Sequence, residues 1–332
     1  MYDRYILDVK MVERPEVRPD LPVTALVEAF GSTLEFNRDL APLTSYKTGG
    51  RARYFLAAES AGEIIRAVRS AERLGLPFFL MGSGSNLLVS DDGYDGLVVR
   101  VSVGGMKLLS ETEIECGAGE ELKDLVDFAT ENGLSGLEFA AGIWGTVGGA
   151  VYGNAGAFGG EIGSILTSAT LVDHDGRVHD VTPSELGFAY RHSVLKETHE
   201  VVVTTRFRLT PADRATVRSK VEEILQARSQ RHPESGSAGC FFKNIPDPTQ
   251  EHGKLPAGRL LEQVGAKQMR VGGARVYEKH ANIIVNSGNA TSTDIRRLAD
   301  ILKQKVREQF GIELQEEVQQ LGHFPSERKS IE

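Results

Sequence analysis

Cysteine and tryptophan are scarce in this chain of 332 residues, which contains only Cys116, Cys240 and Trp144. Two distant cysteines exclude a disulfide framework and a CxxC metal pair, so we expect no bound metal. Such sparing use of cysteine fits a reducing compartment. No apolar run reaches the ~20 residues that a membrane helix needs, and the N-terminal segment lacks the apolar core of a signal peptide. We therefore expect a cytoplasmic protein.

An excess of positive charge is also missing, because the net charge is −8. That balance argues against nonspecific binding to nucleic acid or to an anionic membrane. With 40% hydrophobic and 25% charged residues, the composition is that of an ordinary globular protein. The length suggests two domains or three. We expect neither nucleic acid nor a membrane as a partner, and the sequence does not fix the oligomeric state, although we favour a monomer.

Apolar spacing and turn residues predict four helices and several strands. Ser60 is expected to cap a helix, with Glu63 three residues later and Gly75 at its end. Pro211 favours the first turn of a long helix, and Asp175-Gly176 indicates a hairpin turn. Residues 77–82 are expected to form a short buried strand, and 276–286, 292–311 and 312–318 a strand–helix–strand crossover unit. The other expected helices are 60–75, 119–132 and 210–231, and the other strands are 97–103 and 201–209.

The most informative segment is 142–163, where nine of 22 residues are glycine. Glycine suits a backbone that turns through positive φ or approaches a ligand closely, and successive free N–H groups form an anion site. The chain has neither GxGxxG nor GxxxxGK[ST] there, which excludes the usual dinucleotide and Walker loops. The sequence GSGSN at 82–86, directly after an expected strand, is a second candidate anion loop, although a simple tight turn explains it equally well.

Three further segments carry reactive side chains. Arg191 could pair with a substrate carboxylate, or it could be a surface residue. Cys240, in GSAGCFFKN, could be a nucleophile, a proton donor or a packed core thiol. Glu317 stands beside Glu316, where an exposed carboxylate pair is the default interpretation, and only one of two adjacent residues on a strand can face inward.

Together these segments resemble the UDP-N-acetylenolpyruvoylglucosamine reductases, the flavoenzymes of bacterial peptidoglycan precursor synthesis. The resemblance covers roughly residues 40–322. It rests on TSYKTGG, GSGSNLL, the 142–163 run, the YR-S segment, SAG-FFKN, GGARV-EKHANIIVN and the closing GIEL--EV. Several motifs in the right order are far more specific than any one of them.

The resemblance implies an α+β fold, with a two-part FAD-binding domain of the vanillyl-alcohol-oxidase-like (PCMH) type and a C-terminal α/β substrate-binding domain. The implied ranges are an extension over 1–35, FAD-binding subdomains over 36–105 and 106–211, the substrate-binding domain over 212–324 and a tail over 325–332. We expect the extension to lean on the main body and the tail to be loose.

The resemblance also implies noncovalent FAD, because the 82–86 loop has no histidine for attachment, and NADPH as co-substrate. The implied FAD-binding residues are Tyr46, Lys47, Thr48, Gly82, Ser83, Gly84, Ser85, Asn86, Leu87, Gly142, Gly145, Thr146, Gly148, Gly149, Asn154, Gly156 and Ala157. The implied catalytic residues are Arg191, Cys240 and Glu317, and the implied substrate-binding residues are Tyr190, Lys243, Asn244, Lys254 and His280.

The implied reaction makes chemical demands that these residues can meet. Hydride from reduced flavin N5 adds to the terminal carbon of the enolpyruvyl ether, and negative charge spreads into the neighbouring carboxylate, where a cation such as Arg191 stabilises it. Glu317 would stabilise or orient. The family commonly has serine where Cys240 stands, and a free thiol of pKa ~8.5 is a stronger proton donor than a hydroxyl.

Two departures from the family pattern stand out, since Trp144 and Ile245 replace prolines. Trp144 could alter the loop entry or pack on the flavin. In the longer branch of the family, an extra aromatic loop closes over the substrate. Residues 191–209 leave no room for that loop, so the chain resembles the shorter branch of the family. Two other activities stay open at this point: a flavin oxidase or dehydrogenase of a sugar or hydroxy acid, and a flavin-free thiol transferase or hydrolase using Cys240.

Overall fold

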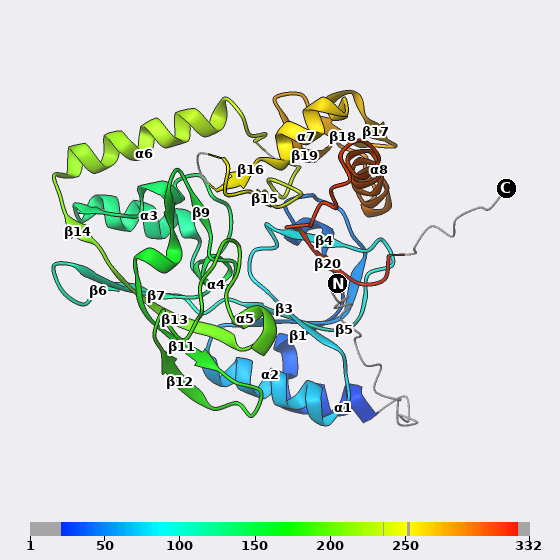
Figure 1. The fold of residues 1–332 in the computed structure, drawn as a ribbon. Coiled ribbons are helices and arrows are strands. Elements are labelled where there is room, and N and C mark those ends of the chain that lie inside the picture. The colour runs from blue at the N-terminus through cyan, green and yellow to red at the C-terminus, as the bar shows by residue number, and fades with distance from the viewer. Residues whose placement is uncertain (1–20, 235, 251–252, 325–332) are drawn as a thin grey trace.

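The structure is a computed structural model that describes residues 21–324 except 235 and 251–252. Its first sheet has the order β1-β2-β5-β3. Strands β2, β5 and β3 are parallel neighbours, and β1 runs antiparallel at the edge. Helices α1 and α2 pack against this sheet through a shared apolar core, at the bottom of Figure 1. The bounds are α1 Leu21–Phe30, β1 Leu34–Asp39, β2 Arg51–Ala58, α2 Ala61–Arg73, β3 Phe78–Met81 and β5 Tyr94–Val101.

The second sheet is antiparallel, with the order β12-β11-β13-β7-β6. Helices α3, α4 and α6 share its core, and the central strand β13 contributes the fully buried Phe207. The bounds are β6 Met106–Leu108, β7 Glu113–Gly117, α3 Leu122–Glu131, α4 Val147–Tyr152, β11 Leu166–Val172, β12 Val178–Val181, α5 Leu195–Thr198, β13 Val201–Arg208 and α6 Arg214–Ser229. Two short pairs accompany it, β8 Leu134–Ser135 with β14 Thr210–Pro211, and β9 Gly156–Ala157 with β10 Gly160–Glu161.

The C-terminal part is a small sheet, β17-β18-β19, with α7 and α8 packed on it. Its core takes in Tyr46 and Leu88 from the first part of the chain, so the parts share buried side chains. The bounds are β15 Ile245–Pro246, β16 Lys254–Leu255, α7 Ala257–Gln263, β17 Arg270–Val271, β18 Ala274–Tyr277, β19 His280–Asn286 and α8 Ser292–Phe310. Short 3-10 turns lie at Gly31–Thr33, Ala41–Leu43, Glu138–Ala140, Ile162–Ser164 and Ala266–Gln268.

The end of the described chain returns to the first glycine loop. Strand β20 (Gln319–Leu321) pairs in parallel with β4 (Leu87–Val89), which directly follows the 82–86 loop. The Asp91 carboxylate accepts hydrogen bonds from the backbone N–H groups of Ser292 and Thr293, at the start of α8. Figure 1 shows β20, in red, beside β4. The C-terminal part is thereby fixed against the loop that follows β3.

Local sequence signals predicted several elements correctly. Ser60 caps α2 by accepting from the Glu63 N–H, and Gly311 ends α8 in the left-handed region at φ 68°. The hairpin at Asp175-Gly176 and the strand over 201–209 are confirmed. Of the expected extension, residues from 21 onward form α1, in which Leu26 is fully buried, whereas residues 1–20 and the tail 325–332 lie outside the described part.

Four expectations were wrong in detail. Pro211 lies in β14, and Asp213 instead caps α6 by accepting from Thr216. The segment 276–286 is not one strand but the hairpin β18–β19, with the charged pair Glu278-Lys279 at its turn. Strand β3 is mostly half-buried because it lies at the sheet edge. The bounds of α3 and β5 differ by one to three residues from 119–132 and 97–103.

The expected crossover unit is also absent. Residues 312–318 form no strand of the C-terminal sheet. They run beside residues 241–243, where Lys243 N–H donates to the Gln315 carbonyl and Glu317 N–H to the Phe241 carbonyl. The final strand β20 then pairs with β4 rather than with β19. Among the described residues, no helix is long and apolar enough to cross a membrane.

Two neighbouring positions on α8 differ in burial, so substitutions at them test how the helix packs. Leu302 is fully buried and Ile301 is 38% exposed. Leu302→Ala is expected to lower the free energy of unfolding by about 2–5 kcal/mol, because it removes buried methyl groups and leaves a cavity. Ile301→Ala should cost less than about 1 kcal/mol. Urea unfolding monitored by circular dichroism measures both, and equal costs would contradict the packing of α8.

Candidate active site

The two glycine-rich loops touch one another. A Cβ atom on Gly82 would lie 2.4 Å from the Thr146 hydroxyl oxygen, and one on Gly145 would lie 2.9 Å from that of Ser85. Gly145 also has a φ of +138°, which L side chains rarely adopt. The loops can approach this closely only because side chains are missing at the contact. Segments 60 residues apart in sequence thereby form one concave surface.

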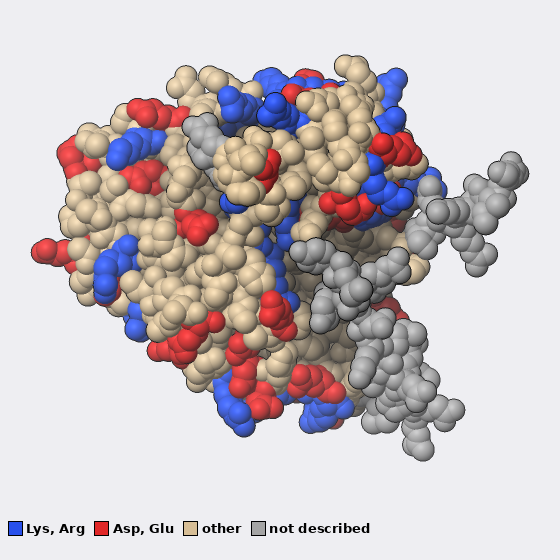
Figure 2. Space-filling model, in the orientation of Figure 1, with Lys and Arg blue, Asp and Glu red and all other residues tan. Residues whose placement is uncertain are grey.

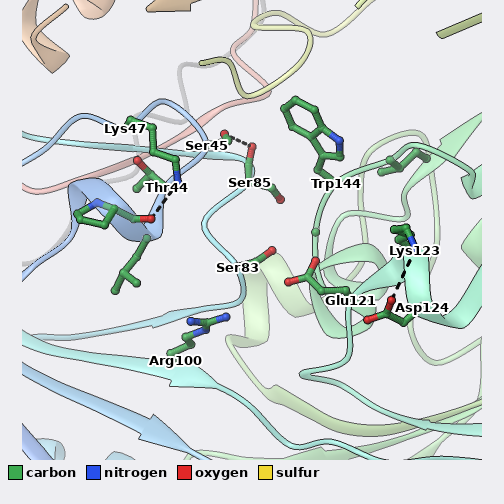
Figure 3. Close-up of a pocket in the computed structure, with 14 residues that line it drawn as sticks. Thr44, Ser45, Lys47, Ser83, Ser85, Arg100, Glu121, Lys123, Asp124 and Trp144 are labelled. Atoms are coloured by element: carbon green, nitrogen blue, oxygen red, sulfur yellow. Dashed lines mark hydrogen bonds and ion pairs between the residues drawn. The ribbon is translucent and has the colours of Figure 1, made fainter. Parts of the chain in front are cut away.

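A pocket of about 400 Å³ opens beside this contact. Figure 3 shows Ser83 and Glu121 pointing toward one another, with Arg100 below them and Trp144 on the opposite side. The buried Ser83 hydroxyl lies beside the Glu121 carboxyl but has no described partner at hydrogen-bond distance and angle. Burial raises the pKa of Glu121. The lining residues are Pro42, Leu43, Thr44, Ser45, Lys47, Ser83, Ser85, Arg100, Glu121, Lys123, Asp124, Ile143, Trp144 and Gly145.

The pocket fits a dinucleotide such as FAD. Side-chain-free backbone is available to a pyrophosphate at Gly145, and the Ser85 hydroxyl lies at the same contact. Lys47 brings positive charge to the lining, and glycine backbone, hydroxyl donors and cations are the groups that bind a diphosphate. The buried Ser83 hydroxyl and Arg100, which line the same pocket, are available to the rest of the dinucleotide.

The expected FAD-binding residues fall into four groups. Lys47, Ser83, Ser85 and Gly145 line the pocket. Four others make hydrogen bonds with their side chains: Thr48 bonds Ser292, Asn86 the Glu317 carbonyl and Asn154 the Ala189 carbonyl, which joins separate segments, and Thr146 caps α4 by accepting from the Gly149 N–H. Tyr46 and Leu87 have buried side chains. The rest contribute backbone to the two loops: Gly82, Gly84, Gly142, Gly148, Gly149, Gly156 and Ala157.

The expected catalytic residues Arg191 and Glu317 form an ion pair, with Arg191 Nε 2.7 Å from Glu317 Oε1. Arg191 Nη2 also donates to the Gly156 carbonyl at 2.9 Å, which ties it to the second glycine loop. Its backbone has φ 54°, an uncommon value for a residue with a side chain. The side chains are 25% and 21% exposed, so Arg191 is not the surface residue that the motif alone left open.

The two adjacent glutamates diverge, as expected for neighbouring extended residues. Glu316 pairs with Arg296 at 2.8 Å and with Lys303 at 3.1 Å, both on α8. Glu317 faces the other way, toward Arg191. Neither is half of an exposed carboxylate pair, so that default interpretation was wrong.

Cys240 lies close enough to the same ion pair for both of its charges to act on the thiol. Burial raises the pKa of its thiol to about 12, the nearby Glu317 carboxylate adds to the rise, and Arg191 and Arg228 oppose it. Its backbone bridges to Ile283 of β19. The fully buried Tyr46 side chain is close enough for the two groups to influence one another, since Cys240 contributes to raising the pKa of Tyr46. Residues 191, 240 and 317 thus converge from distant parts of the chain.

Most of the expected substrate-binding residues lie near this cluster. The Lys254 ammonium is 3.6 Å from the centre of the Tyr190 ring, and the Tyr190 hydroxyl accepts from the Asn244 N–H at 3.3 Å. Lys243 is close enough to lower the pKa of Lys196, after the effect of burial. His280 instead lies beside His232, with ring centres 5.8 Å apart, and no described contact joins it to Arg191 or Cys240.

Two cations near the cluster escaped the sequence analysis. Lys196 donates to the Arg191 carbonyl at 2.8 Å and lies 5.5 Å from the Tyr152 ring centre. Arg228, from α6, influences Cys240 and lies 5.6 Å from the Phe158 ring. Neither has a local signal, because Lys196 follows YR-S by three residues and Arg228 sits on an ordinary amphipathic helix. Figure 2 shows a hollow at the centre of this face with Lys and Arg atoms in its depth.

Four residues that line the pocket were not predicted from the sequence: Arg100, Glu121, Lys123 and Asp124. Arg100 could have been suspected, because it is a cation within the apolar strand LVVRVSV. The other three stand at the start of α3, where acidic and basic residues are common on any exposed first turn.

Comparisons with known proteins agree with this architecture. A family model described as an FAD binding domain matches residues 52–182, and one described as the C-terminal domain of UDP-N-acetylenolpyruvoylglucosamine reductase matches residues 231–321. The UDP-N-acetylenolpyruvoylglucosamine reductase 2 of Symbiobacterium thermophilum is 40% identical over 284 residues, 85% of this chain and 90% of that protein. The reductase of Moorella thermoacetica is 41% identical over 287 residues, 86% of this chain and 92% of that protein.

A solved structure matches as well. The crystal structure of the UDP-N-acetylenolpyruvylglucosamine reductase (MurB) from Thermus caldophilus superposes with a TM-score of 0.73 at 34% identity, covering 87% of this chain and 98% of that one. The fold and site therefore define a flavoprotein oxidoreductase with an FAD-binding domain and a separate C-terminal domain, which confirms the expected fold class. The chain belongs to the UDP-N-acetylenolpyruvoylglucosamine reductase family.

The electrostatics of Cys240 can be tested through its alkylation rate. Removing the Glu317 charge takes away one cause of the raised pKa, so Glu317→Gln should lower the pKa of Cys240 and speed its reaction with iodoacetamide. Cys116, whose pKa burial and Glu120 raise to about 12, is the internal control and should keep its rate. Mass spectrometry of labelled peptides at pH 8 measures both. An unchanged Cys240 rate, or an equal rise at both thiols, would count against the placement of Glu317.

Proposed function

We propose that this chain reduces the enolpyruvyl ether of UDP-N-acetylglucosamine to the lactyl ether of UDP-N-acetylmuramate, with NADPH as reductant and noncovalent FAD. One observation carries the proposal. Arg191, Cys240 and Glu317 meet beside the two glycine loops, with Arg191 bonded to the Gly156 carbonyl within the second loop. A cation, a proton donor and a cofactor cradle are thereby adjacent.

When bound, FAD supplies the hydride that adds to the terminal carbon of the enolpyruvyl group. Arg191 stabilises the negative charge that develops on the substrate carboxylate. Its Nε is held by Glu317 and its Nη2 by the Gly156 carbonyl, whereas Nη1 has no described partner and is left for the carboxylate. Glu317 therefore orients the guanidinium. It needs no proton of its own for that task.

Cys240 donates the proton to the carbon next to the carboxylate. With a pKa of about 12, its thiol is protonated at pH 7, as a general acid must be. The raised pKa also makes it a weaker acid than the free thiol on which the sequence argument relied, so its advantage over serine shrinks. Arg191 and Arg228 favour the thiolate that remains after proton transfer.

The neighbouring cations suit the UDP part of the substrate. Lys254 and Tyr190 are in contact, and Asn244 is held by Tyr190 and by the Ala257 N–H. Lys243 and these residues would bind phosphate or sugar, with His280 at greater remove. NADPH would use this same space in turn, since the sequence holds no separate dinucleotide fingerprint. The chain is proposed to act as a cytoplasmic monomer.

We assign FAD binding and substrate binding to the sequence ranges expected above. Residues 36–105 and 106–211 would form the two FAD-binding subdomains, and residues 212–324 the substrate-binding domain. The first two ranges contain the separate sheets of the structure, which supports this division. Tyr46 and Leu88 belong to the first range but lie in the hydrophobic core of the C-terminal part, so they join the first FAD-binding subdomain to the substrate-binding domain.

The reaction itself is tested by following NADPH oxidation without oxygen. Purified protein should be yellow, and NADPH should be consumed one for one with the UDP-enolpyruvyl sugar, because the flavin returns its electrons only to that substrate. Colourless protein that cannot be reconstituted with FAD would overturn the proposal. So would turnover that requires oxygen and ignores the sugar, which would favour an oxidase instead.

The role of Cys240 is tested by two substitutions. Cys240→Ala should keep the reduction of flavin by NADPH but slow reoxidation by the enolpyruvyl sugar by about 10²–10⁴-fold, because the general acid is lost. Cys240→Ser should retain turnover within about tenfold of the parent, since a hydroxyl can also donate a proton. Stopped-flow absorbance of the flavin separates the two half-reactions.

Cys116→Ala is the matched control, because Cys116 is buried in the core of the second sheet and should not affect either half-reaction. A Cys240→Ser variant as slow as Cys240→Ala, or a trapped thioether between Cys240 and the substrate, would contradict the role of the thiol as proton donor.

A further inference from the structure

The only tryptophan of the chain stands at the edge of the pocket. The Trp144 side chain is 47% exposed, although tryptophan is usually well buried. It lies directly before Gly145, whose backbone touches Ser85, and Figure 3 shows it across the pocket from Arg100. An exposed indole over a polar pocket presents a large flat apolar surface to whatever enters.

The order of the groups along the site indicates which part of FAD reaches this pocket. At one end, Arg191, Glu317 and Cys240 define the place of the reacting ring, since the flavin must contact the substrate there. Next come Gly156 and Asn86, which bond Arg191 and the Glu317 backbone. Ser85 and Gly145 follow at the contact of the glycine loops.

The pocket at that contact also takes in Ser83, Arg100 and Glu121, none of which has a described contact with Arg191, Glu317 or Cys240. FAD is a linear molecule with the flavin at one end, the pyrophosphate in the middle and adenosine at the other end. With the flavin beside Cys240 and the pyrophosphate at the glycine loops, adenosine is the part that remains for this pocket.

We infer that Trp144 stacks on the adenine of bound FAD and covers the adenosine end of the cofactor. The inference rests on the proposed function, because it requires FAD. A base and an indole gain stacking energy from their π faces without needing any particular hydrogen bond. Arg100 and Glu121 on the opposite side supply polar partners for the base edge or ribose. The indole thus replaces the proline that the family pattern has at this position.

Because Trp144 is the sole tryptophan, its emission reports on this contact alone. ADP, which carries the adenosine end without the flavin, should quench and shift the Trp144 emission when added to the FAD-free protein. FMN, which carries the flavin end without adenosine, should leave the shape of the spectrum unchanged. FAD itself is not used for this readout, because energy transfer to the flavin would quench the indole at any nearby position.

Cofactor affinity gives a second and independent readout on the holoprotein. Trp144→Ala should raise the Kd for FAD, measured by release of fluorescent flavin on dilution, by about 5- to 100-fold, the range expected for one stacked base. Trp144→Phe should stay within about fivefold of the parent. Phe36→Ala is the control, since Phe36 is 48% exposed and does not line the pocket, and it should leave the Kd unchanged.

The outcomes separate this inference from the proposed function. If the protein binds FAD and reduces the enolpyruvyl sugar, yet ADP does not alter the Trp144 emission and Trp144→Ala keeps its Kd, the stacking is wrong and the function stands. A shift of the Trp144 emission spectrum with FMN and none with ADP would place the indole at the flavin end instead. If the protein neither binds FAD nor oxidises NADPH, the proposed function itself fails.

Discussion

The contact between the two glycine loops is the constraint on which the rest of this structure depends. Gly82 faces Thr146 and Gly145 faces Ser85 at distances that leave no room for a Cβ atom. One loop follows the edge strand β3 and the other leads into α4, so the contact joins the parallel sheet to the antiparallel one. A side chain at Gly82 would displace the Thr146 hydroxyl, and one at Gly145 would meet Ser85 and be strained by the φ of +138°.

The C-terminal end of the described chain forms a third side of the candidate active site. Strand β20 pairs with β4, and the Asn86 side chain holds the Glu317 carbonyl. Glu317 is thereby placed where its carboxylate meets Arg191, whose other bond leads back to the second glycine loop. The side chains proposed to be catalytic are therefore held by the same loops that are proposed to hold the cofactor, which under the proposed function couples hydride delivery to charge stabilisation and proton donation.

A feature could be predicted from the sequence when the residues that form it lie close together in the chain. The Ser60 cap of α2, the end of α8 at Gly311 and the hairpin at Asp175-Gly176 depend on neighbours within a few residues, and all three were predicted correctly. The last strand was misplaced because its partner β4 lies more than 200 residues earlier. The convergence of Arg191, Cys240 and Glu317 was anticipated from the family resemblance, whereas Lys196 and Arg228 carry no local signal. Burial also changed the chemistry, since the thiol pKa of about 12 could not be read from the residue type.

A crystal structure of the protein with FAD and the UDP-enolpyruvyl sugar tests most directly whether these three side chains form one catalytic site. The account predicts that the substrate carboxylate lies against Arg191 Nη1 and that the Cys240 sulfur contacts the carbon next to it, on the side away from the flavin ring. A carboxylate turned away from Arg191, with Cys240 out of reach of that carbon, would contradict it.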